Sequence, residues 1–128
     1  MSEFDVEQFV YLKIPADIGP LVRAQRFEDP IDAALGRDGL GEVSGGGSSL
    51  GEARADGSRP IEFCGIDIDC TDREAVLALL RVLLPGLGLP AGSELHYTAS
   101  GLRLQDAFDG DVWTVGEART FLHPGFDV

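Results

Sequence analysis

The sequence has few cysteine, histidine and lysine residues. It contains two cysteines, two histidines and a single lysine among 128 residues. The two cysteines, Cys64 and Cys70, lie on one expected strand, where six residues of extended chain separate them by about 20 Å. That distance is too great for a disulfide. We therefore expect both thiols to be reduced, as in a cytoplasmic protein.

The sequence also lacks an apolar run long enough for a membrane. The most apolar stretch, from Ala75 to Leu84, contains Arg81 and ends at a Pro-Gly pair. A spanning helix needs about 20 apolar residues. The first residues have neither the basic start nor the apolar core of a signal peptide. We therefore expect a cytoplasmic protein with no membrane partner.

Positive charge is scarce. Twenty-two acidic residues stand against ten basic ones, which gives a net charge of −12. Such a chain repels nucleic acid, so we expect no DNA or RNA partner. The charge either serves solubility or attracts a basic protein. All the basic residues except Lys13 are arginine, and with the abundant Ala, Leu and Gly this composition suggests a bacterial protein from a GC-rich genome.

The most informative stretch runs from Pro60 to Asp72 and predicts a central strand that leads directly into a helix. The alternation of apolar residues changes phase after Gly65. This change predicts either a β-bulge at Gly65 or a strand that is buried on both faces. Thr71 and Glu74 have the spacing of a capping box, which predicts that Thr71 caps the following helix.

The other segments predict an α+β fold. We expect strands at 8–14, 42–50, 60–70 and 93–99, and helices that begin at Asp29-Pro30 and at about Asp72. We read residues 16–26 as a loop broken at Gly19-Pro20. The order predicts a ferredoxin-like βαββαβ sandwich, which has an antiparallel sheet and two helices on one face.

One domain accounts for the whole chain, residues 1–128, because this length supplies a single hydrophobic core. We expect residues 1–7 to be a frayed start. A C-terminal hairpin begins at Leu102, and residues 105–128 form an extended tail that packs on the domain through scattered aromatic residues.

The end of the central strand carries the sharpest chemical motif. Residues 67–71, Asp-Ile-Asp-Cys-Thr, resemble the first motif of the haloacid dehalogenase family, Asp-x-Asp-x-Thr. The resemblance implies a Mg²⁺-dependent phosphate enzyme in which Asp67 is the nucleophile and Asp69 the acid/base. That family also has a lysine after the motif, whereas Lys13, the only lysine here, precedes it. We therefore favour a solvated strand end and keep the enzyme as an alternative.

A metal site without catalysis is a second hypothesis for the same residues. Asp67, Asp69 and Asp72 could supply carboxylate oxygens to Mg²⁺ or Ca²⁺. We expect no other cofactor. His96 lies on the polar side of its strand, where it could pair with a nearby aspartate, and neither His96 nor His123 has a nucleophile close to it in the sequence.

A glycine-rich run predicts a weak strand whose backbone is accessible. Its residues are Ser44, Gly45, Gly46, Gly47 and Ser48. The run lacks the Gly-Lys-Ser/Thr ending of a phosphate-binding loop. Small residues in a strand mark a bend, a close approach of another segment, or an edge that accepts a strand from a partner. We therefore regard this run as the candidate partner-binding segment.

We conclude that the sequence predicts a non-catalytic protein that binds another protein, in the manner of an inhibitor, an immunity protein or a regulator. The net charge favours a basic partner. The first alternative is a Mg²⁺-dependent phosphate enzyme that uses Asp67 and Asp69. The second is a ferredoxin-like module that binds a small ligand or forms a homodimer.

Overall fold

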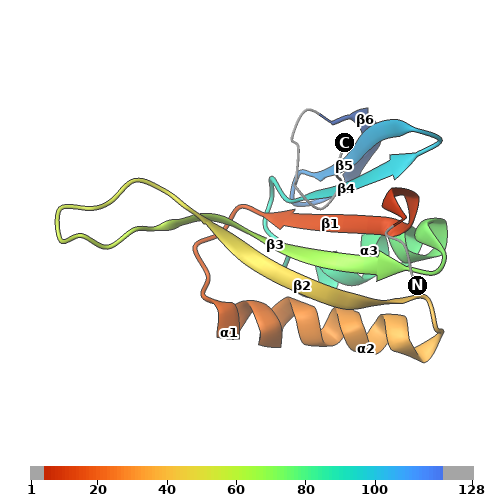
Figure 1. Ribbon diagram of the computed structural model, residues 1–128, viewed down its shortest axis with the longest axis horizontal. Coiled ribbons are helices and arrows are strands. Elements are labelled where there is room, and N and C mark those ends of the chain that lie inside the picture. Colours follow the sequence, from red (N-terminus) through yellow and green to blue (C-terminus); the bar gives the residue numbers. More distant parts are fainter. Residues whose placement is uncertain (1–4, 120–128) are drawn as a thin grey trace.

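A computed structural model describes residues 5–119 and shows a six-stranded antiparallel sheet (Figure 1). The strands lie in the order β2-β3-β1-β4-β5-β6. Their bounds are β1 Phe9–Ile14, β2 Gly41–Leu50, β3 Ile61–Cys70, β4 Glu94–Ala99, β5 Leu102–Phe108 and β6 Trp113–Ala118. The α+β class is therefore confirmed. The strand order differs from that of the predicted ferredoxin-like sandwich, because β5 and β6 extend the sheet beyond four strands.

Two helical segments connect the strands. The first begins with α1 (Pro20–Arg23), continues through a π-helical turn, η2 (Ala24–Glu28), and ends with α2 (Asp29–Arg37). The second is α3 (Arg73–Gly86), and a short 3-10 turn, η1 (Val6–Gln8), precedes β1. The prediction of a loop at 16–26 holds for residues 16–19 and is wrong from Pro20 onward, because Pro20 occupies the first helical turn, where its missing N–H costs nothing.

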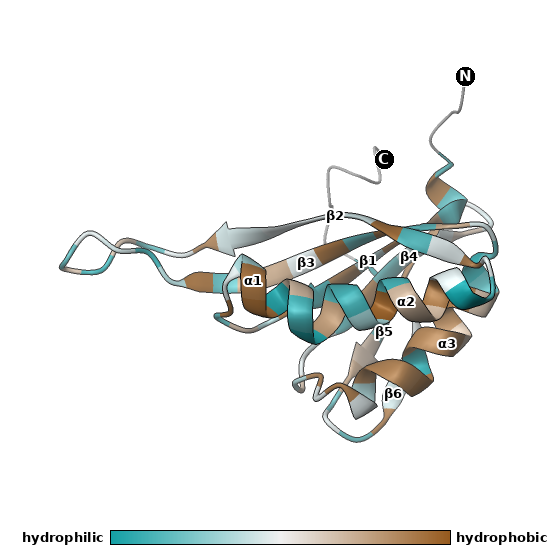
Figure 2. Cartoon of the chain, turned by 90° about the horizontal axis from the view of Figure 1, so that it is seen from below, coloured by the Kyte–Doolittle hydropathy of each residue, from teal (hydrophilic) through white to brown (hydrophobic). Residues whose placement is uncertain are grey.

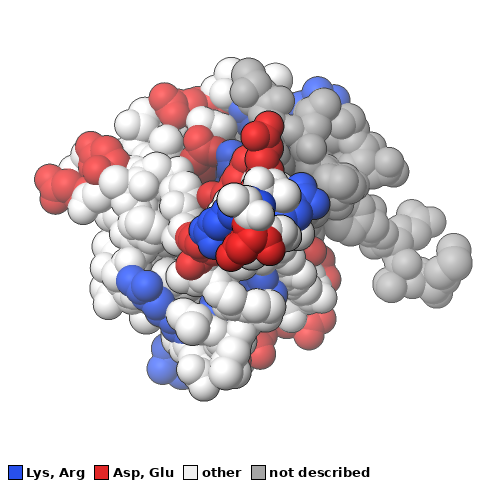
Figure 3. Space-filling view, turned by 90° about the vertical axis from the view of Figure 1, so that its left-hand side faces the viewer, with Lys and Arg blue, Asp and Glu red and all other residues white. Residues whose placement is uncertain are grey.

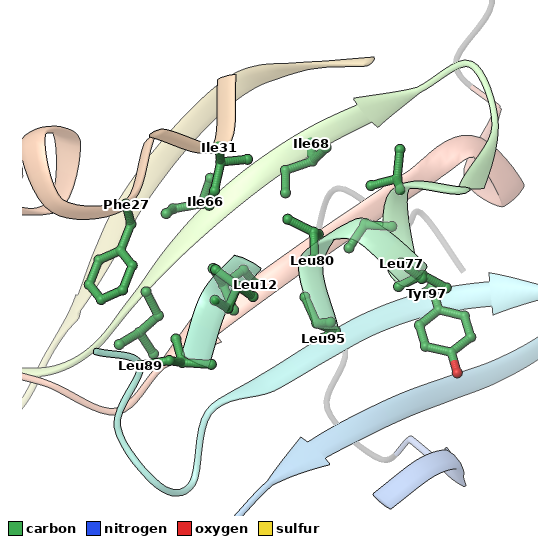
Figure 4. Packing of buried hydrophobic residues seen from close by; sticks show 14 of the residues in the cluster. Leu12, Phe27, Ile31, Ile66, Ile68, Leu77, Leu80, Leu89, Leu95 and Tyr97 are labelled. Atoms are coloured by element: carbon green, nitrogen blue, oxygen red, sulfur yellow. The ribbon is translucent and has the colours of Figure 1, made fainter. Parts of the chain in front are cut away.

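The hydrophobic core lies between the sheet and these helices, which cover one face of it (Figure 2). Alternate residues of the central strands point toward the helices, and Leu12, Ile66 and Leu95 are completely buried there. Leu77 and Leu80 of α3 pack against them (Figure 4). Each such side chain contributes about 1.5–3 kcal/mol through removal from water. No helix within residues 5–119 has the length and apolar character that a membrane span requires.

The opposite face of the sheet explains the change of phase in β3. The pairing of β3 with β1 runs unbroken through Gly65, so the predicted bulge at Gly65 is wrong. Gly65 lies beneath the ring of Tyr11, and a Cβ atom at this position would collide with that ring. The alternative prediction is confirmed for this part of β3, since Cys64, Gly65 and Ile66 are all buried. The irregularities lie in the β2–β3 pairing, between Val43 and Gly45 and again at Leu50.

Residues beyond β4 extend the sheet. Much of the stretch expected as an extended tail, from Gln105 to Ala118, belongs to β5 and β6. A buried ionic network holds these strands to α3: the Arg81 guanidinium contacts Asp106 Oδ2 at 2.7 Å, and Tyr97 donates a 2.6 Å hydrogen bond to Asp106 Oδ1. The tail predicted at 120–128 and the first four residues of the frayed start lie outside the described residues, and residues 6–8 form η1.

Candidate functional site

The three aspartates proposed as metal ligands occupy two different structural positions. Asp67 and Asp69 are two residues apart on β3 and point to the face of the sheet that the helices leave open. Asp72 instead caps α3, where its carboxylate accepts a 3.2 Å hydrogen bond from the N–H of Ala75. Within residues 5–119 no three His, Cys, Asp or Glu side chains are grouped closely enough to hold a metal ion.

The cap at Asp72 also corrects the predicted capping box. Thr71 does not cap α3; its hydroxyl donates a 2.8 Å hydrogen bond to the carbonyl oxygen of Gly39. Glu74 pairs with the neighbouring Arg73 at 2.9 Å instead of reaching back to the cap. The reason is positional: the helix begins one residue later than predicted, so Asp72 takes the cap.

The cysteine inside the motif is not an activated nucleophile. Burial, followed by the charge of Asp69, raises the pKa of the Cys70 thiol to about 12, so the thiol stays protonated at neutral pH. The ammonium group of Lys13 lies 4.6 Å from the centre of the Phe63 ring, in a cation–π contact. This contact holds the side chain of Lys13, on β1, against the neighbouring strand β3.

A shallow open pocket of about 270 Å³ lies where β2 begins and β3 ends. Its walls are formed by Gly39, Gly41, Glu42, Asp69, Cys70 and Thr71. Glu42 and Asp69 are direct partners across the β2–β3 ladder, and both are exposed. Two carboxylates in this arrangement repel each other, which costs a few tenths of a kcal/mol to about 1 kcal/mol. Sequence reasoning missed Glu42, because it pairs with Asp69 only through the strand register.

The glycine-rich run lies on β2, at one edge of the sheet (Figure 1). Its glycines have different surroundings. A Cβ atom at Gly46 would lie 3.0 Å from Glu28 Oε2 and 3.2 Å from Arg23 Nε, and one at Gly45 would lie 3.1 Å from Asp67 Oδ2. A Cβ atom at Gly47 would meet nothing within 4 Å. Glycine therefore gives room to neighbouring charged groups at two positions and leaves open space at the third.

An ion pair on the helix side supports this edge. Arg23 Nε lies 2.5 Å from Glu28 Oε2, and Arg23 Nη1 donates a 3.3 Å hydrogen bond to the hydroxyl of Ser48. Both charged side chains are largely buried. Because the pair sits under Gly46, it fixes α1 and η2 against β2 and keeps the strand extended. The sequence predicted a weak strand at this run but not the ion pair that supports it.

Among residues 5–119, a side chain of α2 protects the edge of β2 near the start of the strand. The carboxylate of Asp32 on α2 accepts a 3.0 Å hydrogen bond from the N–H of Val43. From Gly45 to Leu50 the strand contains no proline and no charged residue. Residues of these kinds usually prevent a sheet edge from pairing with another chain. Gly46, Gly47 and Ser48 are exposed, and Leu50 is 49% exposed.

The loop that follows β2 projects away from the body of the protein (Figure 1). It joins β2 to β3 through residues 51–60 and turns at Gly57, whose positive φ of 88° suits glycine. Basic and acidic side chains lie together at its tip (Figure 3). Arg54 pairs loosely with Asp17 at 3.7 Å. The tip therefore shows no dominant charge of its own.

His96 is a buried residue on the open face of the sheet. Its Nε2 lies 2.9 Å from Glu94 Oε1, so its carboxylate partner is a glutamate on the same strand. Burial lowers the pKa of His96 to about 4, although Glu94 acts in the opposite direction. The imidazole is therefore neutral at pH 7. His123 lies outside the described residues.

Comparison with known proteins gives no match to a family model, to a curated protein or to a solved structure. The class of protein is therefore defined by its own geometry, an α+β sheet with an accessible glycine-rich edge.

Proposed function

We propose that this chain is a non-catalytic protein that binds another protein by adding a strand of that partner to the edge of β2. The observation that carries the proposal is the exposed stretch from Gly46 to Ser48 on β2, which is an edge strand of the sheet. Exposed edges of this kind supply main-chain hydrogen bonds to an extended segment. Side chains at alternate positions of the segment then set its specificity.

Apolar side chains beside the edge support the same function. Leu50 at the end of β2 is 49% exposed, and Leu21 on α1 is 69% exposed. The contact between Arg23 and Ser48 holds α1 against this strand. A strand added along β2 would therefore meet the exposed side chain of Leu50 at one end.

The four strands β1 to β4 support a more specific description of the fold. We propose that they form a ferredoxin-like core to which β5 and β6 are added. Their order within the sheet is β2-β3-β1-β4, with helical segments in the connections from β1 to β2 and from β3 to β4. This core leaves β2 at the edge. A cytoplasmic location is part of the same proposal, since both cysteines are reduced and the thiols are partly or wholly buried.

Site-specific photo-crosslinking in the source organism tests the proposed function. A photoreactive phenylalanine at Gly47 has open space, and the same residue at Gly36 on α2 is the matched control, because a side chain there also meets nothing within 4 Å. We expect a defined protein to be trapped from position 47 and not from position 36. Trapping of the same proteins from both positions would contradict strand addition at β2.

Light scattering on the purified chain separates a second copy from a different partner. We expect the monomer mass at the concentration used for crosslinking, because the proposed partner of β2 is a different protein. A dimer mass that falls to the monomer mass in Gly47→Lys, and not in Gly36→Lys, would show that the edge pairs with its own copy instead. Both substitutions add the same charge in open space.

A further inference from the structure

We propose that the segment added to β2 is basic and that one of its arginine or lysine side chains enters the pocket between Glu42 and Asp69. This inference rests on the proposed function and names the chemistry of the partner. The occupant is a segment of another protein, because carboxylates outnumber basic groups beside the edge of β2.

The carboxylates near the edge outnumber the basic groups. Within residues 5–119, Glu42 and Asp69 take part in no salt bridge, and the Asp32 carboxylate already lies at the edge through its bond to Val43. The basic group that contacts β2 is Arg23, and it is paired with Glu28. A second copy of the chain would add another net charge of −12, which opposes association. Charge complementarity therefore favours a basic segment.

The pocket gives that segment a defined place for one charged side chain. Its volume is about 270 Å³, and Glu42 and Asp69, which are cross-strand partners, both line it. A cation between them removes their mutual repulsion. A guanidinium also donates in two directions, which suits two carboxylates better than a single ammonium group does. We therefore expect arginine to bind more tightly than lysine.

The free edge and the pocket lie within reach of one extended segment. From Gly45 to Glu42 is three residues, or about 10 Å at a rise of about 3.4 Å per residue. A segment that pairs with residues 45–50 and continues for three more residues therefore arrives beside the pocket. Because residues 45 and 47 are glycines, no side chain projects from the open face of β2 at these positions, and a long side chain of the segment can lie across it. About nine residues suffice.

A pair of synthetic peptides tests the inference on the full chain. The probe is a blocked nine-residue peptide of alternating valine and threonine with an arginine at each end; its control has glutamine at both ends. Isothermal titration gives the affinities, and amide hydrogen exchange shows where each peptide binds. We expect the arginine peptide to slow exchange in residues 45–50 and to bind about tenfold more tightly than the glutamine peptide. Glu42→Gln should abolish that difference.

The outcomes separate the two proposals. Equal affinity of the two peptides, with slowed exchange in residues 45–50, would overturn the basic segment and leave strand addition standing. Unchanged exchange in β2 with either peptide would overturn both. An arginine preference that persists in Glu42→Gln and in Asp69→Asn would also overturn the pocket. Thermal melts of both variants are the control for folding, and we expect neither variant to melt lower than the wild type, because each removes a like-charge repulsion.

Discussion

Alanine substitutions at Gly65 and Gly47 test the packing of the sheet with the same chemical change at two neighbouring positions. The two glycines are direct partners in the β2–β3 ladder, so their side chains would point to the same face. At Gly65 the added methyl group would collide with the ring of Tyr11, which is only 5% exposed. At Gly47 it would meet nothing within 4 Å. The two substitutions should therefore have opposite effects.

The magnitudes follow from these surroundings. Gly65→Ala overfills a packed site and should lower the free energy of unfolding by about 1–3 kcal/mol. Gly47→Ala removes backbone freedom from the unfolded chain and should raise the free energy of unfolding by about 0.5–1 kcal/mol. The two variants should thus differ by roughly 1.5–4 kcal/mol, the sum of these two effects.

Urea unfolding followed by circular dichroism measures both values, and the slope with denaturant should be unchanged. In a Tyr11→Leu background the penalty of Gly65→Ala should shrink, because the smaller side chain leaves room for the methyl group. A coupling of about 1 kcal/mol is expected for residues in contact. Equal stability of Gly65→Ala and Gly47→Ala would refute the packing of Tyr11 on Gly65.

Three further predictions follow from the charged groups. The pKa of His96 is about 4 in the folded chain and 6.5 in the unfolded chain. The unfolded chain therefore takes up the proton first, and the free energy of unfolding should fall by about 2 kcal/mol between pH 7 and pH 5. Urea unfolding would show the same fall in His96→Gln if another group caused it. Asp106→Asn should lower the free energy of unfolding by about 3 kcal/mol, because it leaves the charge of Arg81 without its partner. The control, Asp111→Asn at an exposed position, should change it little. Equal melting temperatures of the two variants would contradict a buried ion pair. Asp72→Ala should lower the free energy of unfolding by about 1 kcal/mol through loss of the helix cap, both with and without Mg²⁺. A decrease seen only with Mg²⁺ would favour the metal site instead.

Local patterns in the sequence predicted most of the strands and both main helical regions. The first helix began earlier than predicted, because Gly19-Pro20 was interpreted as a break although proline favours the first turn. The change of phase at Gly65 was visible in the sequence, but its cause was not. The ring that requires a glycine belongs to Tyr11, on another strand. A contact of that kind leaves no local signal.

The added strands and the candidate site depended on long-range pairing. Asp106 is hydrogen-bonded to Arg81, a residue 25 positions earlier, so its neighbours in the sequence give no sign of this contact. Asp72 is close to Asp69 in sequence but caps a helix. Glu42 meets Asp69 because of the register between β2 and β3, which an extra residue at Ser44 shifts for the rest of the strand. The sequence located the accessible edge but not the pocket beside it.

Strand addition to β2 is tested most directly by nuclear magnetic resonance on isotope-labelled protein bound to the unlabelled arginine peptide. Filtered nuclear Overhauser measurements detect only contacts between the two molecules. We predict cross-strand contacts between α-protons of the peptide and α-protons of residues 45–50, since an added strand places these atoms opposite each other. Contacts confined to side chains, or to β6 at the other edge, would contradict the central claim.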